Sequence, residues 1–554
     1  MSIAHLCLDL AHQYGVQFVG IAPGSRSSAL VEAVVPDERF TLNTHFDERS
    51  LAFWALGIAK ASGKPALIIC TSGTAVANLY PAIVEAAESK VPLILLTADR
   101  QEHDKYQGAN QTIYTQQLPL DYLSAYCALD AETCDPDAAK QALTQTLAAG
   151  QDNGLGPVQI NIGFPDPNRV GVKTDEVSAP TVKFGTRPKL TLSTDSDWAL
   201  AQKTIESVRR GCIVVGQWQN FEAIIPIAEQ WNWPILVDIQ SQGRLYEHPL
   251  VVNACELILE KEPALLDSDT VLWFGQRVVS KTLLGWMAER GVVQISDELA
   301  CVDGGLGTRD ERRGSLGTGG GVQRLVAASA DALAQVATWR PNAPPTQALK
   351  TLSKANTTHL NTLKTGFSKT TLTEPEICSY LGSSQVPGHP CLIGNSLAIR
   401  LCNRAWLSRG DGSPIIYANR GASGIDGLIS TAVGIAQASG KYATLIIGDI
   451  SALYDINALF LVKRAPVPVH IWILNNNGGG IFRHLPIGSS DLCEPYFAQP
   501  PKANFKAAAS MATLPYQSIT SRDELNSVKT NPHQSILIEC QVSSSDTQIW
   551  YNSL

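Results

Sequence analysis

An internal repeat constrains the fold of this chain more than any other feature of its sequence. The octet at residues 57–64, GIAKASGK, recurs 377 residues further on at 434–441 as GIAQASGK, with seven of the eight residues identical. A second pair of segments, VPLILLTADR at 91–100 and VPVHIWILNN at 467–476, matches at an offset of 376. Unrelated helix–strand units share an order of elements but not seven identities in eight. We therefore predict that the first and last parts of the chain are two copies of one α/β fold.

Apolar runs alternate with helical patterns along the whole chain, which predicts an α/β protein with three doubly wound parallel-sheet domains, the first and third homologous. We expect a first domain over residues 1–180, a central α/β domain over 190–340 and a third domain over 346–554. The segments 179–190 and 340–345 carry Pro and polar residues and are interpreted as linkers.

Composition limits the classes of function. The chain has 554 residues, of which 44% are hydrophobic and 17% charged, so several domains of ordinary size with ample core are expected. A net charge of −8 without a basic block argues against a nucleic-acid partner, and no apolar run is long enough to span a membrane. A polar, Gly-rich segment at 303–321 is interpreted as a surface loop.

The cysteines and the N-terminal segment both favour a cytoplasmic location. The twelve cysteines form no CxxC pair and most lie in apolar runs, as expected for buried thiols in a reducing compartment. The first fifteen residues lack the basic start and long apolar core of a signal peptide, and are interpreted as a helix.

Polar residues follow two apolar runs in the C-terminal copy of the repeat. The run at 443–447 leads into Asp449, the run at 467–474 leads into Asn476, and a helix is predicted over 451–463 between them. Parallel strands end at one edge of a sheet, so a carboxylate and a carboxamide should lie close together there. Such oxygen ligands suit Mg²⁺ shared with a phosphorylated ligand, whose phosphates the helix N-terminus would face. An ordinary crossover with polar caps is the alternative.

The register of the repeat indicates that the two copies differ in function. Asp449 falls opposite Ser72, and Asn476 falls opposite Arg100, so only the third domain carries the pair of metal-ligand type. Ile425 in turn falls opposite Glu48.

The GD…NN pattern resembles the metal and diphosphate signature of thiamine diphosphate (ThDP)-dependent enzymes. The resemblance implies a pyrimidine-binding first domain and a pyrophosphate-binding third domain, with ThDP and Mg²⁺, or Mn²⁺ as an alternative, as cofactors. It implies metal ligation by the side chains of Asp449 and Asn476 and by the Gly478 carbonyl. Further residues are implied to contact the cofactor: Gly448, Ile450, Ser451, Ile481 and Phe482.

Within this resemblance Glu48 is the catalytic residue. Its carboxyl group would hydrogen-bond the aminopyrimidine of the cofactor, tuning the acid–base chemistry that the cofactor performs. The alternative is a helix N-terminal carboxylate that complements the helix dipole. Ile425 would support the bent form of the cofactor, and plain core packing is its alternative.

Several longer strings narrow the resemblance to one family, the 2-succinyl-5-enolpyruvyl-6-hydroxy-3-cyclohexene-1-carboxylate (SEPHCHC) synthases of menaquinone or phylloquinone biosynthesis. The strings span both cofactor domains: PGSRSS at 23–28, HFDER at 45–49, TSGTAVANLYPA at 71–82, LLTADR at 95–100, GANQTI at 108–113, GNSLAIR at 394–400, NRGASGIDG at 419–427 and NNNGGGIF at 475–482. The resemblance implies decarboxylation of 2-oxoglutarate and addition of the succinyl unit to isochorismate.

Both implied substrates are dicarboxylates, for which arginine is the preferred partner. The resemblance assigns Ser396 and Arg400 to the distal carboxylate of the oxoglutarate-derived part, and it includes Asn395 among the substrate residues. Residues that would face isochorismate or line its site are Arg26, Arg100, Asn110, Gln111, Arg420, Phe482 and Lys281. For each arginine an inconsequential surface ion pair is the alternative.

The chain departs from the family pattern in three places. Gly480 stands where a Gln is usual, Thr282 stands where an Arg usually follows Lys281, and Gln101-Glu102 replaces a Pro-Pro pair. These departures bear on substrate affinity more than on reaction type.

Rival interpretations are a ThDP carboligase of acetolactate-synthase type, an inactive ThDP-fold protein and a nucleotide-binding Rossmann protein. The number of arginines argues against the acetolactate-synthase type, and the presence of Glu48 and Asp449 argues against an inactive protein. No GxGxxG follows a predicted strand, which argues against a Rossmann protein. The resemblance also implies a homodimer at minimum, with a dimer of dimers left open. Glu48 and Asp449 of different chains would then serve one cofactor.

Overall fold

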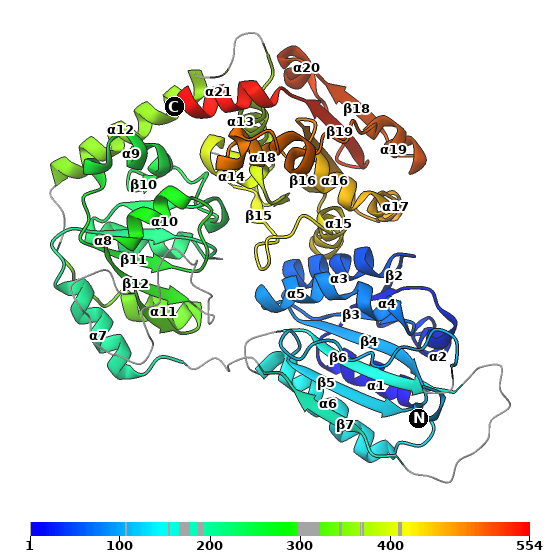
Figure 1. Cartoon of the computed structure of the whole chain (residues 1–554). Coiled ribbons are helices and arrows are strands. Elements are labelled where there is room, and N and C mark those ends of the chain that lie inside the picture. Colours follow the sequence, from blue (N-terminus) through cyan, green and yellow to red (C-terminus); the bar gives the residue numbers. More distant parts are fainter. Residues whose placement is uncertain are drawn as a thin grey trace.

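Three β-sheets with helices packed around them make up the chain, as seen in the computed structural model (Figure 1). The described residues are 2–105, 108–152, 156–165, 178–186, 192–218, 220–296, 322–342, 346–365, 367, 371–407 and 413–553. The predicted loop at 303–321 lies outside them. Apart from one edge strand, all strand pairs in the sheets are parallel, which confirms the predicted fold class.

The first sheet has seven strands in the order β2-β1-β3-β4-β6-β5-β7. Its strands are β1 (Phe18–Ile21), β2 (Thr41–Thr44), β3 (Ala66–Cys70), β4 (Leu93–Arg100), β5 (Ala125–Asp130), β6 (Val158–Phe164) and β7 (Thr181–Phe184). Its helices are α1 (Ile3–Gln13), α2 (Ser28–Val34), α3 (Glu48–Ser62), α4 (Thr74–Asn78), α5 (Tyr80–Glu88) and α6 (Pro136–Asp152). The central strands β3 and β4 are buried almost throughout, which explains their continuous apolar sequence.

The third sheet has six strands in the order β15-β14-β16-β17-β19-β18. Its strands are β14 (Pro390–Ile393), β15 (Ile415–Tyr417), β16 (Ala443–Gly448), β17 (Val469–Asn475), β18 (Tyr516–Ile519) and β19 (Ile536–Gln541). Its helices are α13 (Glu374–Ser384), α14 (Leu397–Ala405), α15 (Leu428–Ser439), α16 (Asp449–Tyr454), α17 (Leu459–Arg464), α18 (Gly480–Arg483), α19 (Phe505–Met511), α20 (Arg522–Ser527) and α21 (Ser544–Ser553). Counted along the chain, both sheets follow the order second, first, third, fourth, sixth, fifth. The common topology confirms the homology that the repeat predicts.

The middle sheet is parallel, in the order β10-β9-β8-β11-β12-β13. Its strands are β8 (Gly211–Val215), β9 (Ile235–Val237), β10 (Val251–Val252), β11 (Thr270–Phe274), β12 (Gly291–Ser296) and β13 (Val322–Val326). Its helices are α7 (Asp195–Glu206), α8 (Ile225–Trp231), α9 (Cys255–Lys261), α10 (Lys281–Ala288) and α11 (Ser329–Val336). The long helix α12 (Thr346–Thr365) also packs on this part, because Asn356 Oδ1 accepts a hydrogen bond from Ala254 N at 2.8 Å.

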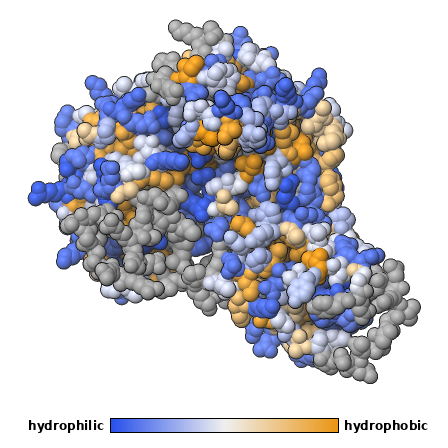
Figure 2. All heavy atoms as spheres, viewed as in Figure 1, coloured by the Kyte–Doolittle hydropathy of each residue, from blue (hydrophilic) through white to orange (hydrophobic). Residues whose placement is uncertain are grey.

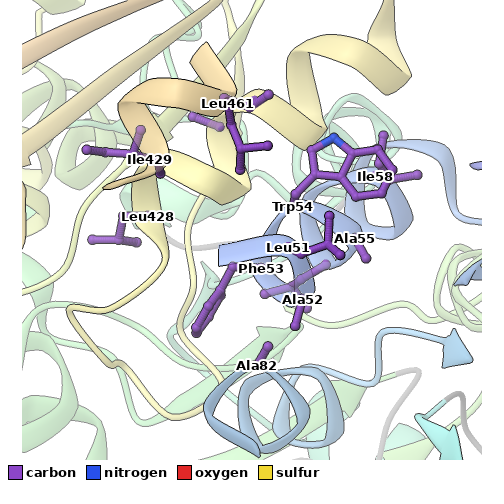
Figure 3. Close-up of a cluster of buried hydrophobic side chains, with 14 of the residues drawn as sticks. Leu51, Ala52, Phe53, Trp54, Ala55, Ile58, Ala82, Leu428, Ile429 and Leu461 are labelled. Carbon is purple, nitrogen blue, oxygen red and sulfur yellow. The ribbon is translucent and has the colours of Figure 1, made fainter. Parts of the chain in front are cut away.

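The two copies of the repeated octet face each other across the packed helices α3 and α15. A Cβ atom at Gly57 would lie 2.1 Å from the Thr431 carbonyl oxygen, and one at Gly434 would lie 2.1 Å from that of Trp54. Only glycine lets the two backbones approach this closely. Residues of α3, α5, α15 and α17 form one hydrophobic core, in which Phe53, Leu428 and Leu461 lie together (Figure 3). The first and third parts of the chain therefore share a core.

Two local predictions are wrong. The segment interpreted as a linker after residue 179 contains the edge strand β7, which pairs antiparallel with β5 because that edge is otherwise uncovered. The single helix predicted over 451–463 is broken into α16, a short 3₁₀ turn (Ile456–Ala458) and α17. The break falls at Asp455, whose buried carboxylate accepts hydrogen bonds from Ser430 N and from Ser50 on α3.

In the face shown in Figure 2, hydrophobic residues occur in scattered groups among hydrophilic ones. Among the described residues, no helix combines the length and apolar character needed to cross a bilayer.

Candidate active site

The predicted metal pair lies at the ends of adjacent strands. Strands β16 and β17 are paired in parallel, with Gly448 opposite Leu474. Asp449 begins α16 directly after β16, and Asn476 follows the last residue of β17. Both side chains are buried, so the pairing brings a carboxyl and a carboxamide to one point at the carboxyl edge of the sheet.

A tight turn after β17 holds this arrangement. Asn477 has a φ of 57° and Gly478 a φ of 132°, and a side chain at 478 would collide with the Ala498 carbonyl oxygen. The Gly478 N–H donates to Asp449 Oδ2 at 2.7 Å, which ties the turn to the end of β16. The Gly478 carbonyl, the third predicted ligand, accepts a hydrogen bond from Gly480 N at 2.8 Å and keeps its second lone pair.

An open cavity with about 610 Å³ of empty space, part of it continuous with solvent, lies at this edge of the sheet. All the residues predicted to contact the cofactor line it, with the exception of Glu48, and so do three of the predicted substrate residues: Asn395, Ser396 and Phe482. Six further lining residues lie outside the predicted set of contacts: Glu374, Leu397, Ala398, Leu474, Gly479 and Gly480.

The polar groups of the cavity are arranged for a cation. Burial raises the pKa of Asp449 to about 6 and that of Glu374 to about 7, and among the described residues neither carboxylate forms an ion pair that would offset its desolvation. Asn476 Oδ1 is buried and has no hydrogen-bond partner among the described residues. A divalent cation bound here would accept Asn476 Oδ1 as a ligand and would neutralise the charge of Asp449. Among the described residues, no group of three His, Cys, Asp or Glu side chains is arranged to hold a metal ion.

The loop at 419–424, between β15 and α15, is held by all three parts of the chain. The buried Glu85 on α5 accepts hydrogen bonds from Gly421 N and Ala422 N at 3.0 and 2.7 Å, and it pairs with Lys60 at 3.2 Å. Arg277 of the middle part donates to the carbonyls of Arg420 and Gly421. The loop leads to Ile425 on the cavity wall, so these contacts fix one side of the cavity.

The predicted substrate residues form two groups. In the first, Arg420 Nη1 donates to Asn395 Oδ1 at 3.2 Å, and Arg400 donates to the Ser396 carbonyl at 2.5 Å, one turn along α14. Burial lowers the pKa of Arg400. This group adjoins the cavity through Asn395 and Ser396.

The second group lies on the first domain. Arg100 Nε donates to the Asn110 carbonyl at 2.7 Å, and Gln111 Nε2 donates to the Ser72 carbonyl at 2.9 Å. Arg26 is buried and donates to the carbonyls of Phe164 and Pro165. Lys281 belongs to neither group and is exposed at the first residue of α10. None of these five residues lines the cavity of the single chain.

Glu48 is also apart from the cavity. It is the first residue of α3, which Asp47 caps by accepting hydrogen bonds from Arg49 N and Ser50 N. Its neighbour Arg49 donates to the Tyr454 carbonyl at the far end of α16 from Asp449. Glu48 is partly exposed and, within the described part of the chain, accepts no hydrogen bond from another side chain. One chain alone thus does not bring Glu48 and the metal pair together.

Glu374 is the main residue of the cavity that the sequence analysis missed. It is a buried acid at the start of α13, and its Oε1 accepts a hydrogen bond from Asn476 Nδ2 at 2.9 Å. It precedes Asn476 by 102 residues and belongs to no recognisable motif, so the sequence carries no signal for it.

Comparisons with known proteins agree with this fold and place the chain in an enzyme class. The model of the thiamine pyrophosphate enzyme N-terminal TPP binding domain matches residues 1–119, and that of the middle domain of thiamine pyrophosphate enzymes matches residues 186–385. The latter match includes α12, which packs on the middle sheet, and α13. Benzoylformate decarboxylase from Polynucleobacter necessarius has the same fold, with a TM-score of 0.69, 14% identity and coverage of 98% of this chain and 99% of that chain. Fold and site thus define a thiamine diphosphate-dependent enzyme.

Curated relatives narrow the class. The SEPHCHC synthase of Shewanella baltica is 34% identical over 537 residues, covering 93% of this chain and 90% of the relative. The SEPHCHC synthase of Aeromonas salmonicida is 33% identical over 581 residues, covering 98% of this chain and 95% of the relative. The chain belongs to the SEPHCHC synthase family.

Proposed function

We propose that this protein removes CO₂ from 2-oxoglutarate and joins the remaining succinyl unit to isochorismate, forming 2-succinyl-5-enolpyruvyl-6-hydroxy-3-cyclohexene-1-carboxylate. The observation that carries the proposal is the cavity at the ends of β16 and β17, where the unpartnered Asn476 Oδ1 and the buried Asp449 converge. The names of the family members supply the product.

Asp449, Asn476 and the Gly478 carbonyl would hold Mg²⁺, or Mn²⁺ in its place, together with the diphosphate of the cofactor. Gly448, Ile450 and Ser451 adjoin these ligands and would contact the diphosphate. Bound ThDP supplies the electron sink that decarboxylation and carbon–carbon bond formation require. The apolar side chains around it would exclude water: Ile425, Ile481 and Phe482.

The arginines would recognise carboxylates. Arg400 adjoins Ser396, and Arg420 adjoins Asn395, so this group can hold the distal carboxylate of the oxoglutarate-derived part and the near side of isochorismate. The group on the first domain, Arg26, Arg100, Asn110 and Gln111, would face isochorismate, with Lys281 as a further cation.

A homodimer would complete each site. The partly exposed Glu48 lies outside the cavity of its own chain, and the two acids that line this cavity, Asp449 and Glu374, are next to Asn476 or its turn. Glu48 of the partner subunit would then hydrogen-bond the aminopyrimidine and hold the proton that the cofactor's acid–base chemistry needs.

Incubation with 2-oxoglutarate, isochorismate, ThDP and Mg²⁺ tests the proposal. We expect loss of isochorismate absorbance, release of one CO₂ per isochorismate and a product of the matching mass. Pyruvate in place of 2-oxoglutarate is the control for a carboligase of acetolactate type. Formation of acetolactate from pyruvate, with isochorismate left unchanged, would contradict the proposal.

A further inference from the structure

Glu374 forms a direct contact with one member of the predicted metal pair. Its side chain is 2% exposed, lines the cavity and accepts the Asn476 Nδ2–H through Oε1 at 2.9 Å. Its second oxygen, Oε2, is buried and has no hydrogen-bond partner among the described residues. The polar neighbours of the carboxyl group are therefore Asn476 and the Thr547 hydroxyl, and among the described residues it forms no ion pair.

This contact decides which end of the Asn476 amide faces the cavity. A carboxamide has a donor end and an acceptor end, and a carboxyl oxygen takes the donor end. With Nδ2 turned to Glu374, Oδ1 is directed away from Glu374 and remains without a partner. With Glu374 ionised, the opposite orientation would set two acceptor oxygens against each other in a buried site and leave both unsatisfied.

The surroundings leave the amide little room to turn elsewhere. A Cβ atom at Gly480 would lie 2.3 Å from Asn476 Nδ2, so the backbone at 480 closes that side. Asp449 is itself fixed by hydrogen bonds from Gly478 N and Ile450 N. Glu374 is thus the only side chain among the described residues that holds the amide end of Asn476.

We propose that Glu374 is a positioning residue of the metal site, which accepts the Asn476 Nδ2–H and thereby presents Asn476 Oδ1 to the divalent cation. The inference rests on the proposed function, because it takes Asn476 to be a metal ligand. Outer partners that orient metal ligands commonly change metal affinity by about 10–100-fold when they are removed. Substitution of Glu374 should therefore weaken binding of the cation even when no substrate is present.

The affinity of the full-length protein for Mn²⁺ at saturating ThDP tests this role. It is measured from the electron paramagnetic resonance signal of the free Mn²⁺ ion. Glu374→Met keeps the volume but removes the acceptor, so we expect a loss of Mn²⁺ affinity of about 10–100-fold. Glu374→Gln retains one acceptor oxygen and should recover part of that affinity. Glu374→Ala removes the same acceptor and replaces the Met variant if that variant does not fold.

Glu376→Gln is the matched control. Glu376 is a buried acid on the same helix, but it pairs with Arg522, at 3.0 Å between Oε2 and Nη2, and does not line the cavity. Its variant should lose thermal stability and keep wild-type Mn²⁺ affinity. Equal affinity in wild type and in the folded Met or Ala variant would overturn the inference. If Asn476→Ala also binds Mn²⁺ normally, the proposed metal site itself fails; if only Asn476→Ala weakens binding, the role of Glu374 alone fails.

Discussion

At the scale of single residues, the site combines buried acids with an unpartnered amide oxygen. Asp449 and Glu374 lie within a few ångströms of Asn476 or its turn, and burial raises the pKa of both. Such groups are costly to bury without a counter-charge, which a folded chain tolerates where a ligand supplies that charge. A cation between Asp449 and Asn476 would supply that charge.

Asp449→Asn tests that cation. The amide keeps an oxygen for Gly478 N and fills the same space, so the fold should persist while the charge that attracts the cation is lost. We expect Mg²⁺-dependent ThDP binding, measured by calorimetry, to weaken by at least the 10–100-fold typical of lost outer partners. Asp491→Ala, at an exposed position of the same domain, is the control. Unchanged ThDP affinity in Asp449→Asn would remove Asp449 from the metal site.

His45, three residues before Glu48, predicts a loss of stability in acid. Its ring is 1% exposed, and burial lowers the pKa of His45 to about 4, an effect that Asp47 opposes and Arg464 reinforces. The unfolded chain binds a proton near pH 6.5, so stability should fall as the pH drops from about 6.5 to about 4, by at most about 3 kcal/mol. His45→Gln should reduce this acid loss in urea unfolding at pH 7.5 and 5, whereas the exposed His533→Gln should not. Equal pH dependence in all three proteins would contradict the assignment.

At the scale of elements, the crossing of α3 and α15 joins the two copies of the fold. The crossing places the glycines of the repeated octets in contact and aligns one shared core (Figure 3). The same α3 carries Glu48 at its first residue, and the loop that precedes α15 carries Arg420 and Ile425. The packing of α3 against α15 thus sets the positions of Glu48, Arg420 and Ile425, which are proposed to contact cofactor or substrate.

Gly57→Ala should destabilise the protein, although alanine is the better helix former. The added Cβ would lie 2.1 Å from the Thr431 carbonyl oxygen, a backbone atom that cannot turn aside. Overpacking of this kind costs about 1–3 kcal/mol. The control is Gly285→Ala in α10, where no atom lies within 4 Å of the added Cβ, and a gain of about 0.5–1 kcal/mol is expected. Thermal melting that shows the same sign for both variants would contradict this account of the crossing.

At the scale of the whole molecule, the repeat made the architecture predictable from sequence. Seven identities in the octet implied two equivalent sheets, and both have the same strand order. The pair Asp449 and Asn476 was also predictable, because parallel neighbouring strands must end together. Glu374 was not, because a contact between residues 102 apart depends on how α13 packs against the sheet. The break at Asp455 likewise depends on Ser50 of another domain, which no local pattern encodes.

The assembly follows from the same division of labour. One copy of the fold carries the proposed metal ligands Asp449 and Asn476, the other carries Glu48, and Glu48 does not line the cavity of its own chain. Two chains related by a two-fold axis would form two identical sites, each with Glu48 from one subunit and Asp449 from the other.

A hybrid dimer tests whether Glu48 of one subunit and Asp449 of the other serve the same site. Glu48→Gln and Asp449→Asn chains, each nearly inactive as a homodimer, are co-expressed with different tags and purified as the heterodimer. One of its sites then collects both substitutions and the other has neither, so the account predicts about half of the wild-type SEPHCHC synthase activity per dimer. A heterodimer as inactive as its parents would mean that both residues serve a cofactor within one chain, and would contradict the account.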